Sequence, residues 1–465
     1  MNFLTFSVVI LYTFSLAVTN PAYGSYYQQP EKSDRYSFNQ WYVSGLGSDS
    51  NDGKTIKTSF RTLKKAAEVV GAGDIVLIGN GIYEDTSRNN SGSLITISKS
   101  GRPDAWITWK ALPGQRPELH ASGWGGITIT SSYHVLDGLT IIGRNDSLTL
   151  KDALNDAKNT TPNSVFNTNG IVIDGRRMPD DAKPHHVIIK NCSVGKCPGG
   201  GITVLEADYV TVEDCSIFDN AWYMRYAGSG LTTLNNWAFD DKPGYHIIIQ
   251  RNLVWNNKTL VPWERTGKLS DGNGILLDVT DLKTGATNPN ADSTLTPNIK
   301  RVVSKRPEWK GRALIANNIS AYNGGSGIHT FRTSHVDIIN NTTYWNGSVV
   351  GYEELFPNRS SDIVILNNII VPRPGGRVTS DNRNEAIRWD YNLYPSEQKV
   401  FKGEHDIVRE PLFYSIPVRL TTKSFLPKKG SPAIGTGTDD LQQATDIEGK
   451  KRPIATKRDR GANEQ

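Results

Sequence analysis

The chain has 465 residues, a formal net charge of +5, 43 glycines and three cysteines. Because this length exceeds that of most compact domains, we expect either several domains or one elongated repetitive domain. The many glycines and short apolar runs favour a β-rich, turn-dense protein, and three cysteines are too few to staple it with disulfides. The net charge is small enough to be explained by solubility alone, so we expect no nucleic-acid partner. This charge allows an acidic polymer as partner but does not indicate one.

The first predicted element is a secretion signal. An apolar run extends from residue 3 to about 18, and Ala22, Tyr23 and Gly24 then suit signal-peptidase cleavage. We predict a signal peptide at 1–24 and a mature protein that is secreted, extracellular or periplasmic. An N-terminal anchor stays an alternative, because no Lys or Arg precedes the apolar run. No later stretch is long and apolar enough to span a bilayer, so we expect no membrane contact after cleavage.

The next predicted element is a capping helix. Within 59–70 the apolar residues recur at helical spacing and give one apolar face: Phe60, Leu63, Ala66, Ala67 and Val70. A solenoid needs such a cover over its first turn. We assign 41–85 to this N-terminal cap.

Self-similar segments follow the cap. Six of them begin with Gly and an apolar residue, at Gly126, Gly170, Gly201, Gly230, Gly274 and Gly327. Alternating apolar strands such as HVIIKNCS, YVTVEDCS and HVDIINNTT form a second register. The shortest spacings are about 20 to 30 residues, which is typical of parallel β solenoids. We predict that 25–465 form one all-β domain, a parallel β-helix with coils over about 95–395.

A polar residue ends each strand of the second register. These residues are Asn191, Asp214, Asn252, Asn318, Asn341 and Asn368. A buried Asn at the same corner of every coil can satisfy backbone groups above and below it. Cys192 and Cys215 directly follow two of these positions, so we expect them to stack as small inward residues, either reduced or as a disulfide; Cys197 is the third cysteine.

Two insertions and a terminal segment complete the chain. The polar stretches 144–168 and 279–312 interrupt the coils, and solenoid insertions gather on one face, so they either wall a groove or form tolerated surface loops. A turn-rich C-terminal segment covers 396–465.

The ends and the coils together carry a family resemblance. The opening YVSGLGSDSNDG, the helix SFRTLKKAAEVV with GAGDIVLIGNGIY, the repeats, and the closing GSPAIG, DIEGKKRP and RGANE resemble secreted right-handed parallel β-helix proteins of the pectate-lyase-like superfamily. The resemblance covers nearly all of 41–465. It implies the fold rather than one reaction, because that superfamily includes polysaccharide lyases, glycoside hydrolases, epimerases and phage tailspikes.

One coil resembles family 9 pectate lyases more specifically. Residues 271–274 (D-G-N-G) match the family stretch D-G-N-G-F-K-L-G, in which the lysine is the base that takes the proton α to the uronate carboxylate. Ile275 takes the aromatic position and Leu276 stands where the lysine would be. The aspartate-rich coil that holds calcium in that family is also not evident, because the preceding coil reads GSGLTTLN. A lyase reaction would therefore need another base.

Strand geometry selects the candidate catalytic residues. In each Gly start the alternate residues face outward, which places His329 and Asp278 as diagonal neighbours about 8 Å apart on one face, both exposed. We predict a catalytic group of Lys268, His329, Arg332 and Asp271, with Lys268, His329 or Tyr226 as base and Arg225, Arg265 or Arg332 neutralising a carboxylate. Exposed rings beside charges suit sugars, and the predicted substrate-binding residues are Trp222, Tyr223, Arg225, Tyr226, Trp263 and Arg265.

These residues favour a polysaccharide lyase that cleaves a uronate-containing polysaccharide by β-elimination. Calcium is a possible cofactor, held by Asp271, Asn273 and Asp278. A glycoside hydrolase is an alternative, using loop carboxylates such as Glu264, Asp271, Asp240 and Asp241. A non-catalytic glycan-binding β-helix is a third. We expect a polysaccharide partner and a monomer.

Overall fold

The computed structural model describes residues 38–465 except 86–91, 281–305, 418, 442 and 454–456. The predicted signal peptide and most of the 279–312 insertion lie outside these residues. Among the helices of the described part, none has the length and apolar character that a membrane span requires.

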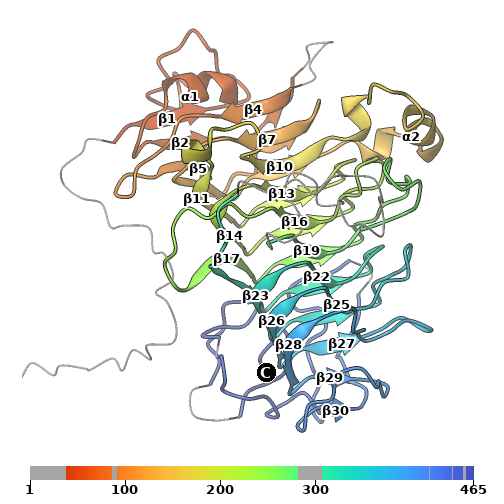
Figure 1. Cartoon of the computed structure of the whole chain (residues 1–465). Helices are drawn as coiled ribbons and strands as arrows, with labels where there is room; N and C mark the ends of the chain where they lie inside the picture. Colours follow the sequence, from red (N-terminus) through yellow and green to blue (C-terminus); the bar gives the residue numbers. More distant parts are fainter. Residues whose placement is uncertain (1–37, 86–91, 281–305, 418, 442, 454–456) are drawn as a thin grey trace, which may run out of the picture.

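Parallel strands from successive coils form three sheets that wind into a right-handed β-helix (Figure 1). Every pair of neighbouring strands in these sheets runs parallel, and from β2 to β25 each coil contributes one strand to each sheet and lies on the coil before it. The predicted fold class is confirmed.

The first sheet, sheet A, has eleven strands. They are β1 (Gln40–Val43), β2 (Ile75–Ile78), β5 (Ile107–Ala111), β8 (His134–Asp137), β11 (His185–Lys190), β14 (Asp208–Glu213), β17 (Tyr245–Gln250), β20 (Arg312–Ala316), β23 (Ser334–Ile339), β26 (Ser361–Leu366) and β28 (Glu385–Asp390). Sheet B also has eleven: β3 (Ile82–Tyr83), β6 (Glu118–His120), β9 (Thr140–Ile142), β12 (Ser193–Gly195), β15 (Ser216–Phe218), β18 (Leu253–Trp255), β21 (Ile319–Ala321), β24 (Thr342–Tyr344), β27 (Ile369–Val371), β29 (Leu393–Tyr394) and β30 (Ile407–Val408).

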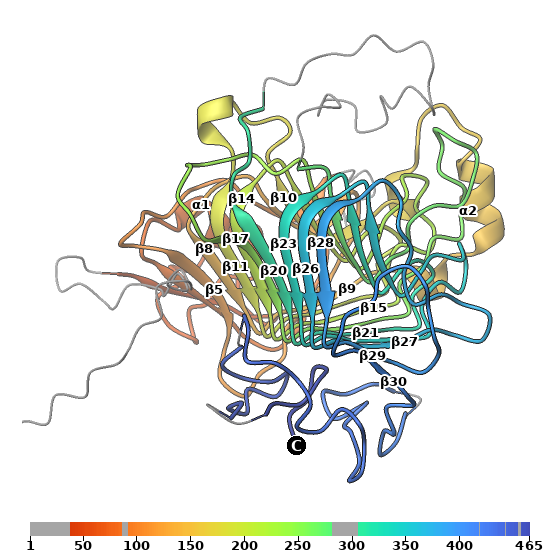
Figure 2. The same cartoon turned by 60° about the horizontal axis from the view of Figure 1, so that its bottom comes forward.

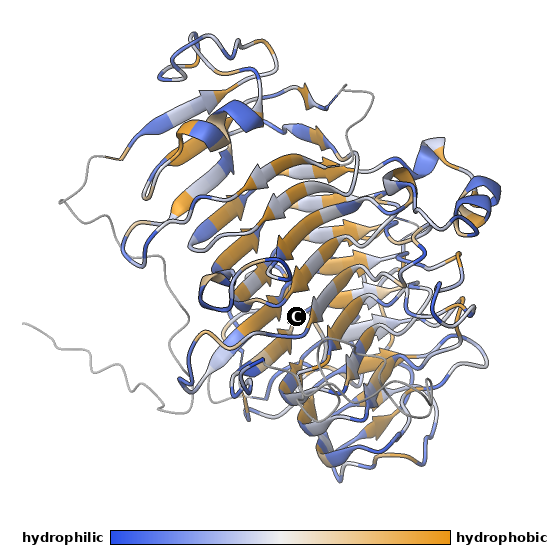
Figure 3. Ribbon diagram, turned by 45° about the horizontal axis from the view of Figure 1, so that its top comes forward, coloured by the Kyte–Doolittle hydropathy of each residue, from blue (hydrophilic) through white to orange (hydrophobic). Residues whose placement is uncertain are grey.

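Sheet C has eight strands and contains the predicted Gly starts. They are β4 (Ser93–Ile97), β7 (Gly125–Ile129), β10 (Asn169–Asp174), β13 (Ile202–Leu205), β16 (Leu231–Leu234), β19 (Ile275–Asp278), β22 (Ile328–Phe331) and β25 (Leu355–Asn358). The six predicted starts all fall here, in consecutive coils from β7 to β22. Apolar strands wind around the core and polar residues gather in the connections (Figure 3).

Close packing between coils explains the glycines. A Cβ on Gly230 would lie 2.8 Å from the carbonyl oxygen of Gly274 in the next coil and 2.6 Å from the Asn257 side chain. Real Cβ atoms do not approach other atoms this closely, so only glycine fits at this position, where the buried side chain of an asparagine packs against the start of the strand.

Two ladders of buried asparagines run along the interior. In the first, each side chain accepts from the backbone N–H and side-chain amide of the residue one coil earlier, at 2.8–3.1 Å. Its members are Asn252, Asn318, Asn341, Asn368 and Asn392. The second ladder, which the repeat analysis did not identify, repeats the pattern five residues later: Asn220, Asn257, Asn323 and Asn346.

The predicted register was wrong at two positions. Asn191 and Asp214 do not lie in the ladder but one residue before it, at positive φ on the corner of the coil. Cys192 and Cys215 occupy the inward positions, as predicted, and are buried free thiols, as is Cys197. The sequence alignment matched polar residues with one another, whereas in the structure the stacked positions are those whose side chains point into the interior, whatever their residue type.

Helices occupy few residues. Helix α1 (Leu63–Val69) begins after Thr62, whose side chain accepts from the Lys65 backbone N–H, and lies beside β1 and β4 at the N-terminal end of the stack (Figure 1). Phe60, Leu63, Ala66 and Val70 are buried as its apolar face; its role as a cap stays a prediction. The 144–168 insertion forms η1 (Asn145–Ser147), α2 (Leu150–Asp156) and η2 (Ser164–Phe166), and η3 (Asp180–Ala182) follows β10.

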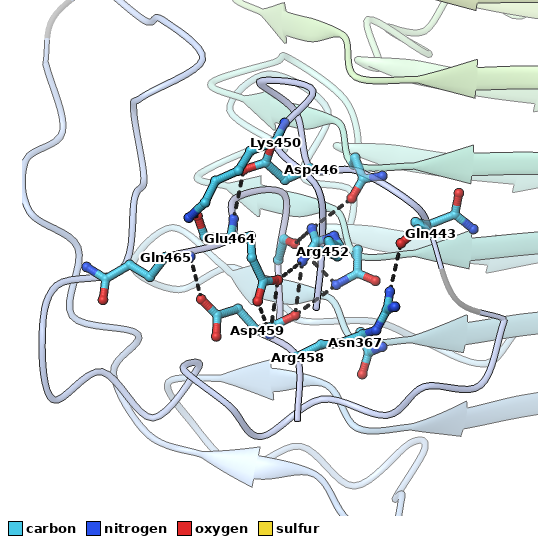
Figure 4. Close-up of polar contacts among 12 residues, drawn as sticks. Asn367, Gln443, Asp446, Lys450, Arg452, Arg458, Asp459, Glu464 and Gln465 are labelled. Atoms are coloured by element: carbon cyan, nitrogen blue, oxygen red, sulfur yellow. Dashed lines mark hydrogen bonds and ion pairs between the residues drawn. The ribbon is translucent and has the colours of Figure 1, made fainter. Parts of the chain in front are cut away.

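The C-terminal segment folds back over the outer face of sheet B (Figure 2). Its Leu420, Phe425 and Ile447 pack against β18, β21 and β24. Buried polar contacts fix it: Arg452 donates to Glu464 at 2.6 Å and to the Asn317 side chain of the helix corner at 2.8 Å (Figure 4).

The ladder makes a testable prediction. Asn318→Ala removes the acceptor of Asn252 and the donors to Asn341 and the Ile249 carbonyl, so we expect a loss of about 2–4 kcal/mol in the free energy of unfolding, measured by denaturant titration. The control is Asn191→Ala, an exposed corner residue whose side chain bonds Asp137; it should cost under about 1 kcal/mol. Equal losses would contradict the corrected register.

Candidate active site

Register in sheet C brings the predicted residues together. Leu276 of β19 pairs with His329 of β22, and His329 pairs with Phe356 of β25. Two residues further on, Asp278 pairs with Phe331. His329 and Asp278 are therefore diagonal neighbours on adjacent coils, as predicted. All of them lie on the outward face of the sheet, because the residues between them face the core.

The column of Leu276, His329 and Phe356 is buried, which corrects the prediction that His329 is exposed, whereas Asp278 and Phe331 are partly exposed. His329 has 5% of its surface exposed and Leu276 3%. The Phe356 ring stacks on His329 with centroids 4.7 Å apart, and Tyr352 and Phe331 approach it edge-on at 5.7 and 6.2 Å. The aromatic rings of β22 and of the coil of β25 thus shield the imidazole from water.

Burial sets the charge of His329. It lowers the pKa of His329 to about 3, so the imidazole is neutral at physiological pH. Among the described residues, neither ring nitrogen has a hydrogen-bond partner. A buried polar group without a partner costs free energy, and the described residues supply no partner for this imidazole.

The turn 270–273 positions a carboxylate at the beginning of β19. Asp271 has φ 61° and Gly272 φ 70°, which turns the chain into the strand. Asn273 is fully buried: its side chain donates to Asp271 at 3.1 Å and accepts from the Ser326 backbone N–H at 2.8 Å. The Ser270 hydroxyl donates to the other Asp271 oxygen at 3.2 Å. The D-G-N-G sequence therefore builds a rigid turn that holds Asp271.

Two carboxyl groups in this coil have raised pKa values. Burial raises the pKa of Asp271 to about 6. Burial, and then the charge of Asp271, raise the pKa of Asp278 to about 8, although Arg332 acts in the opposite direction. Arg332 is buried, and its guanidinium lies 5.4 Å from the Phe331 ring centroid. At neutral pH Asp271 is ionised and Asp278 is a neutral acid, whose Oδ1 has no hydrogen-bond partner in the described part of the chain.

These residues fit calcium poorly. Ca²⁺ takes six to eight oxygen ligands, but the Asn273 oxygen already accepts from Ser326, which leaves two carboxyl groups. Within the described ranges no three His, Cys, Asp or Glu side chains cluster as a metal site.

The other predicted residues lie outside this cluster. Trp222 and Tyr223 pack with α2 residue Ala153 and with Val261, and Arg225 is buried in an ion pair with Glu264 at 2.9 Å. Their contacts are thus with the 144–168 insertion, and whether they also bind substrate stays a prediction.

The remaining candidates lie on more exposed turns. Trp263 and Lys268 pair across a hairpin whose tip includes Arg265, and both charged residues are exposed. Tyr226 is partly buried with its ring 6.3 Å from that of Trp124, which is 38% exposed. Trp124 was missed because it precedes the glycine that marks the strand.

Sequence reasoning also missed Tyr352 and Phe356. Tyr352 precedes β25 and Phe356 lies in it, and β25 follows Glu354 rather than Gly, so this coil lacks the marker that identified the other coils. Glu354 replaces that glycine because it ends the second asparagine ladder, accepting from the Asn346 backbone and side chain at 2.6 Å. The only available signal was its position one coil after His329.

Comparison with known proteins agrees with this architecture. A family profile described as Pel9A-like, right handed beta helix region, matches residues 41–360. Pectate lyase Pel9A has a similar fold, with a TM-score of 0.50, 14% identity, and coverage of 92% of this chain and 97% of that one. A rhamnogalacturonan lyase (TM-score 0.44, 16% identity, 84% and 96% covered) and XylC in complex with xylose (0.44, 12%, 91% and 98%) are more distant.

No curated protein matches the chain significantly in sequence. The profile match spans most of the coils, including the turn at 271–274 and the strands that carry His329 and Phe356. The chain belongs to the family with a Pel9A-like right-handed β-helix region.

Proposed function

We propose that the protein is a secreted polysaccharide lyase that cleaves a uronate-containing polysaccharide by β-elimination at the outward face of β19 and β22. The observation that carries the proposal is a set of three groups on adjacent coils: a neutral imidazole without a hydrogen-bond partner among the described residues (His329), a neutral carboxylic acid (Asp278) and a buried guanidinium (Arg332). The substrate class follows the family and the name of the related pectate lyase.

Asp278 and Arg332 serve the substrate carboxylate. Abstraction of the proton α to that carboxylate pushes negative charge onto its oxygens, so the barrier falls when a cation and a hydrogen-bond donor lie against them. Arg332 supplies the charge. Asp278, neutral below a pH of about 8, donates its proton in a hydrogen bond where an ionised aspartate would repel the uronate.

His329 is the proposed base. The family lysine is replaced by Leu276 in the same column, one coil before His329. The neutral imidazole accepts the α proton, the electron pair forms the carbon–carbon double bond, and the glycosidic oxygen leaves and takes up a proton. A pKa of about 3 makes the free ring a weak base, but a bound carboxylate stabilises the imidazolium and raises that pKa. Solvent water supplies the proton to the leaving oxygen, and Lys268, the alternative base predicted from sequence, lies on an exposed hairpin outside this cluster.

A second function is favoured by one observation. Asp271 and Asp278 interact electrostatically, and at neutral pH Asp278 is protonated and Asp271 ionised; glycoside hydrolases likewise pair a protonated acid with an ionised carboxylate. The other predicted loop carboxylates are engaged elsewhere: Glu264 with Arg225, Asp240 with Tyr209 and Asp241 with Lys310.

One experiment separates these functions. The mature protein is incubated with polygalacturonate, alginate, glycosaminoglycans and neutral xylan, with and without a calcium chelator, while ultraviolet absorbance and reducing ends are followed together. Elimination raises both signals on acidic substrates. Reducing ends without absorbance identify hydrolysis, and silence on every acidic substrate contradicts the lyase proposal. Loss of activity in the presence of the chelator would indicate that the reaction requires calcium.

His329→Gln tests the proposed base. We expect elimination to fall at least about 100-fold in kcat, because general base catalysis contributes about that much or more. His120→Gln is the matched control, since His120 lies in sheet B, partly exposed. Unchanged kcat in His329→Gln would assign the base elsewhere. Because His329 is buried, thermal unfolding is measured in parallel.

The pH profile tests Asp278. Because Asp278 must be protonated, kcat/KM should fall as pH rises through about 8. Asp271→Asn removes the negative charge that raises this pKa, so the alkaline limb should move to lower pH by up to about one unit. Asp241→Asn, whose carboxylate pairs with Lys310, should leave the limb in place. A limb that moves upward, or not at all, in Asp271→Asn would contradict the assignment.

A further inference from the structure

Sheet C carries almost no charge before the candidate active site. In the described strands β4, β7, β10, β13 and β16, the only charged side chain is that of Asp174. Both of its oxygens accept from the Arg176 guanidinium, at 3.0 and 2.9 Å. Ionisable groups appear in the next two strands, with Asp278 on β19 and His329 on β22. A ligand that extends from His329 toward β4 therefore meets strands whose one charge is already paired.

Threonines line the outward face of these uncharged strands. They stack in the same column as His329, with Val172 between the first two, and we call them the threonine column: Thr128, Thr203 and Thr232. All three are partly exposed, whereas His329 is buried. A hydroxyl group both donates and accepts hydrogen bonds, so the column can bind the hydroxyl groups of a sugar.

Two aromatic rings lie beside this face. Trp124 directly precedes β7, and a Cβ on the next residue, Gly125, would lie 3.3 Å from the Thr128 hydroxyl. Tyr226 belongs to the loop before β16 and is partly exposed. The two ring centroids are 6.3 Å apart with the planes inclined at 38°, and 38% of the Trp124 surface is exposed. The pair thus joins connections that are three coils apart in the stack.

The loop that carries Tyr226 is held in place by the neighbouring residue. Arg225 is buried, pairs with Glu264 at 2.9 Å and donates to the Asn159 carbonyl of the 144–168 insertion at 2.9 Å. The Glu264 backbone N–H donates in return to the Arg225 carbonyl at 3.0 Å. Because these contacts order the loop without a ligand, binding at Tyr226 loses little conformational entropy.

The combination of rings and hydroxyl groups matches the two surfaces of a neutral sugar. The C–H face of a sugar packs on an aromatic ring while its hydroxyl groups bond to polar side chains. A carboxylate at this place would meet no cation in the described strands β4 to β16, and Asp174 would repel it. Coils are about 4.8 Å apart, which places Thr232 roughly 10 Å and Thr128 roughly 24 Å from His329 along the helix axis.

We propose that Trp124, Tyr226 and the threonine column form a binding site for neutral sugars on the β7 side of His329. The substrate is then a heteropolymer in which neutral sugars separate the uronates, rather than a polyuronate. This inference rests on the proposed function for the place of the reacting uronate. It adds Trp124 and the threonine column as binding residues.

Affinity for two acidic polymers tests the neutral-sugar site. Retardation of the protein is measured in native gels that contain gellan, in which neutral sugars separate the uronates, or polygalacturonate, in which every sugar is a uronate. Trp124→Ala should weaken gellan binding roughly three- to tenfold, and Thr232→Val roughly two- to fivefold. Trp124→Phe keeps a ring and should stay within about twofold of the wild type, as should the affinity of every variant for polygalacturonate.

Trp345→Ala is the matched control for Trp124→Ala. Trp345 is 41% exposed and follows β24 of sheet B, where its ring stacks on Tyr344 with centroids 5.1 Å apart. Its replacement should leave binding of both polymers unchanged. Thermal unfolding of each variant is measured in parallel.

The outcomes separate this inference from the lyase reaction. Wild-type affinity for gellan in Trp124→Ala, an equal loss in Trp345→Ala or on polygalacturonate, or no binding of gellan by the wild type would overturn the neutral-sugar site. Gellan binding that depends on Trp124, without elimination of any acidic polymer, would support the site and contradict the lyase. Elimination of gellan with the same KM in Trp124→Ala as in the wild type would do the reverse.

Discussion

Parallel pairing at a fixed coil spacing is the constraint on which the rest of the structure depends. Each residue lies directly over its counterpart in the next coil, about 4.8 Å away, so a side chain must be compatible with a copy of its own kind. Apolar residues satisfy this condition by packing. Asparagine satisfies it because it carries both a donor and an acceptor, which is why it forms ladders at two corners and why Glu354 can end one.

The same constraint creates the candidate site. Residues that stack on the outward face of a sheet can form a site when they differ in type from coil to coil, as Leu276, His329 and Phe356 do. Aromatic stacking removes water from this face, and the lost solvation keeps His329 and Asp278 neutral. A neutral Asp278 costs stability as pH rises from about 4 toward 8, because the unfolded carboxyl releases its proton and the folded one keeps it. Burying these ionisable groups to bind a charged substrate thus lowers the free energy of unfolding compared with an apolar face at the same place.

Much of the fold was predictable from sequence, because its signals are periodic. The Gly starts located six strands of sheet C, and the alternating segments located six of the eleven strands of sheet A. The wrong predictions share one cause: residues were assigned to stacked positions by their type, whereas the direction of the side chain determines which residue lies in the interior. Asn191 was placed in a ladder whose inward position belongs to Cys192, and the second ladder was missed because its asparagines lie in turns. In the site, alternation placed His329 and Asp278 correctly as neighbours, but exposure depends on the rings of Tyr352 and Phe356, which come from a coil without the Gly marker.

The protonation of Asp278 at neutral pH is the central physical claim, because the donor to the substrate carboxylate depends on it. Infrared difference spectra between the wild type and Asp278→Asn, recorded across a pH titration, measure it directly. A protonated-carboxyl band present at pH 7 in the wild type alone, and lost as pH passes about 8, is the predicted result. A carboxylate band from Asp278 at pH 7 would contradict the account.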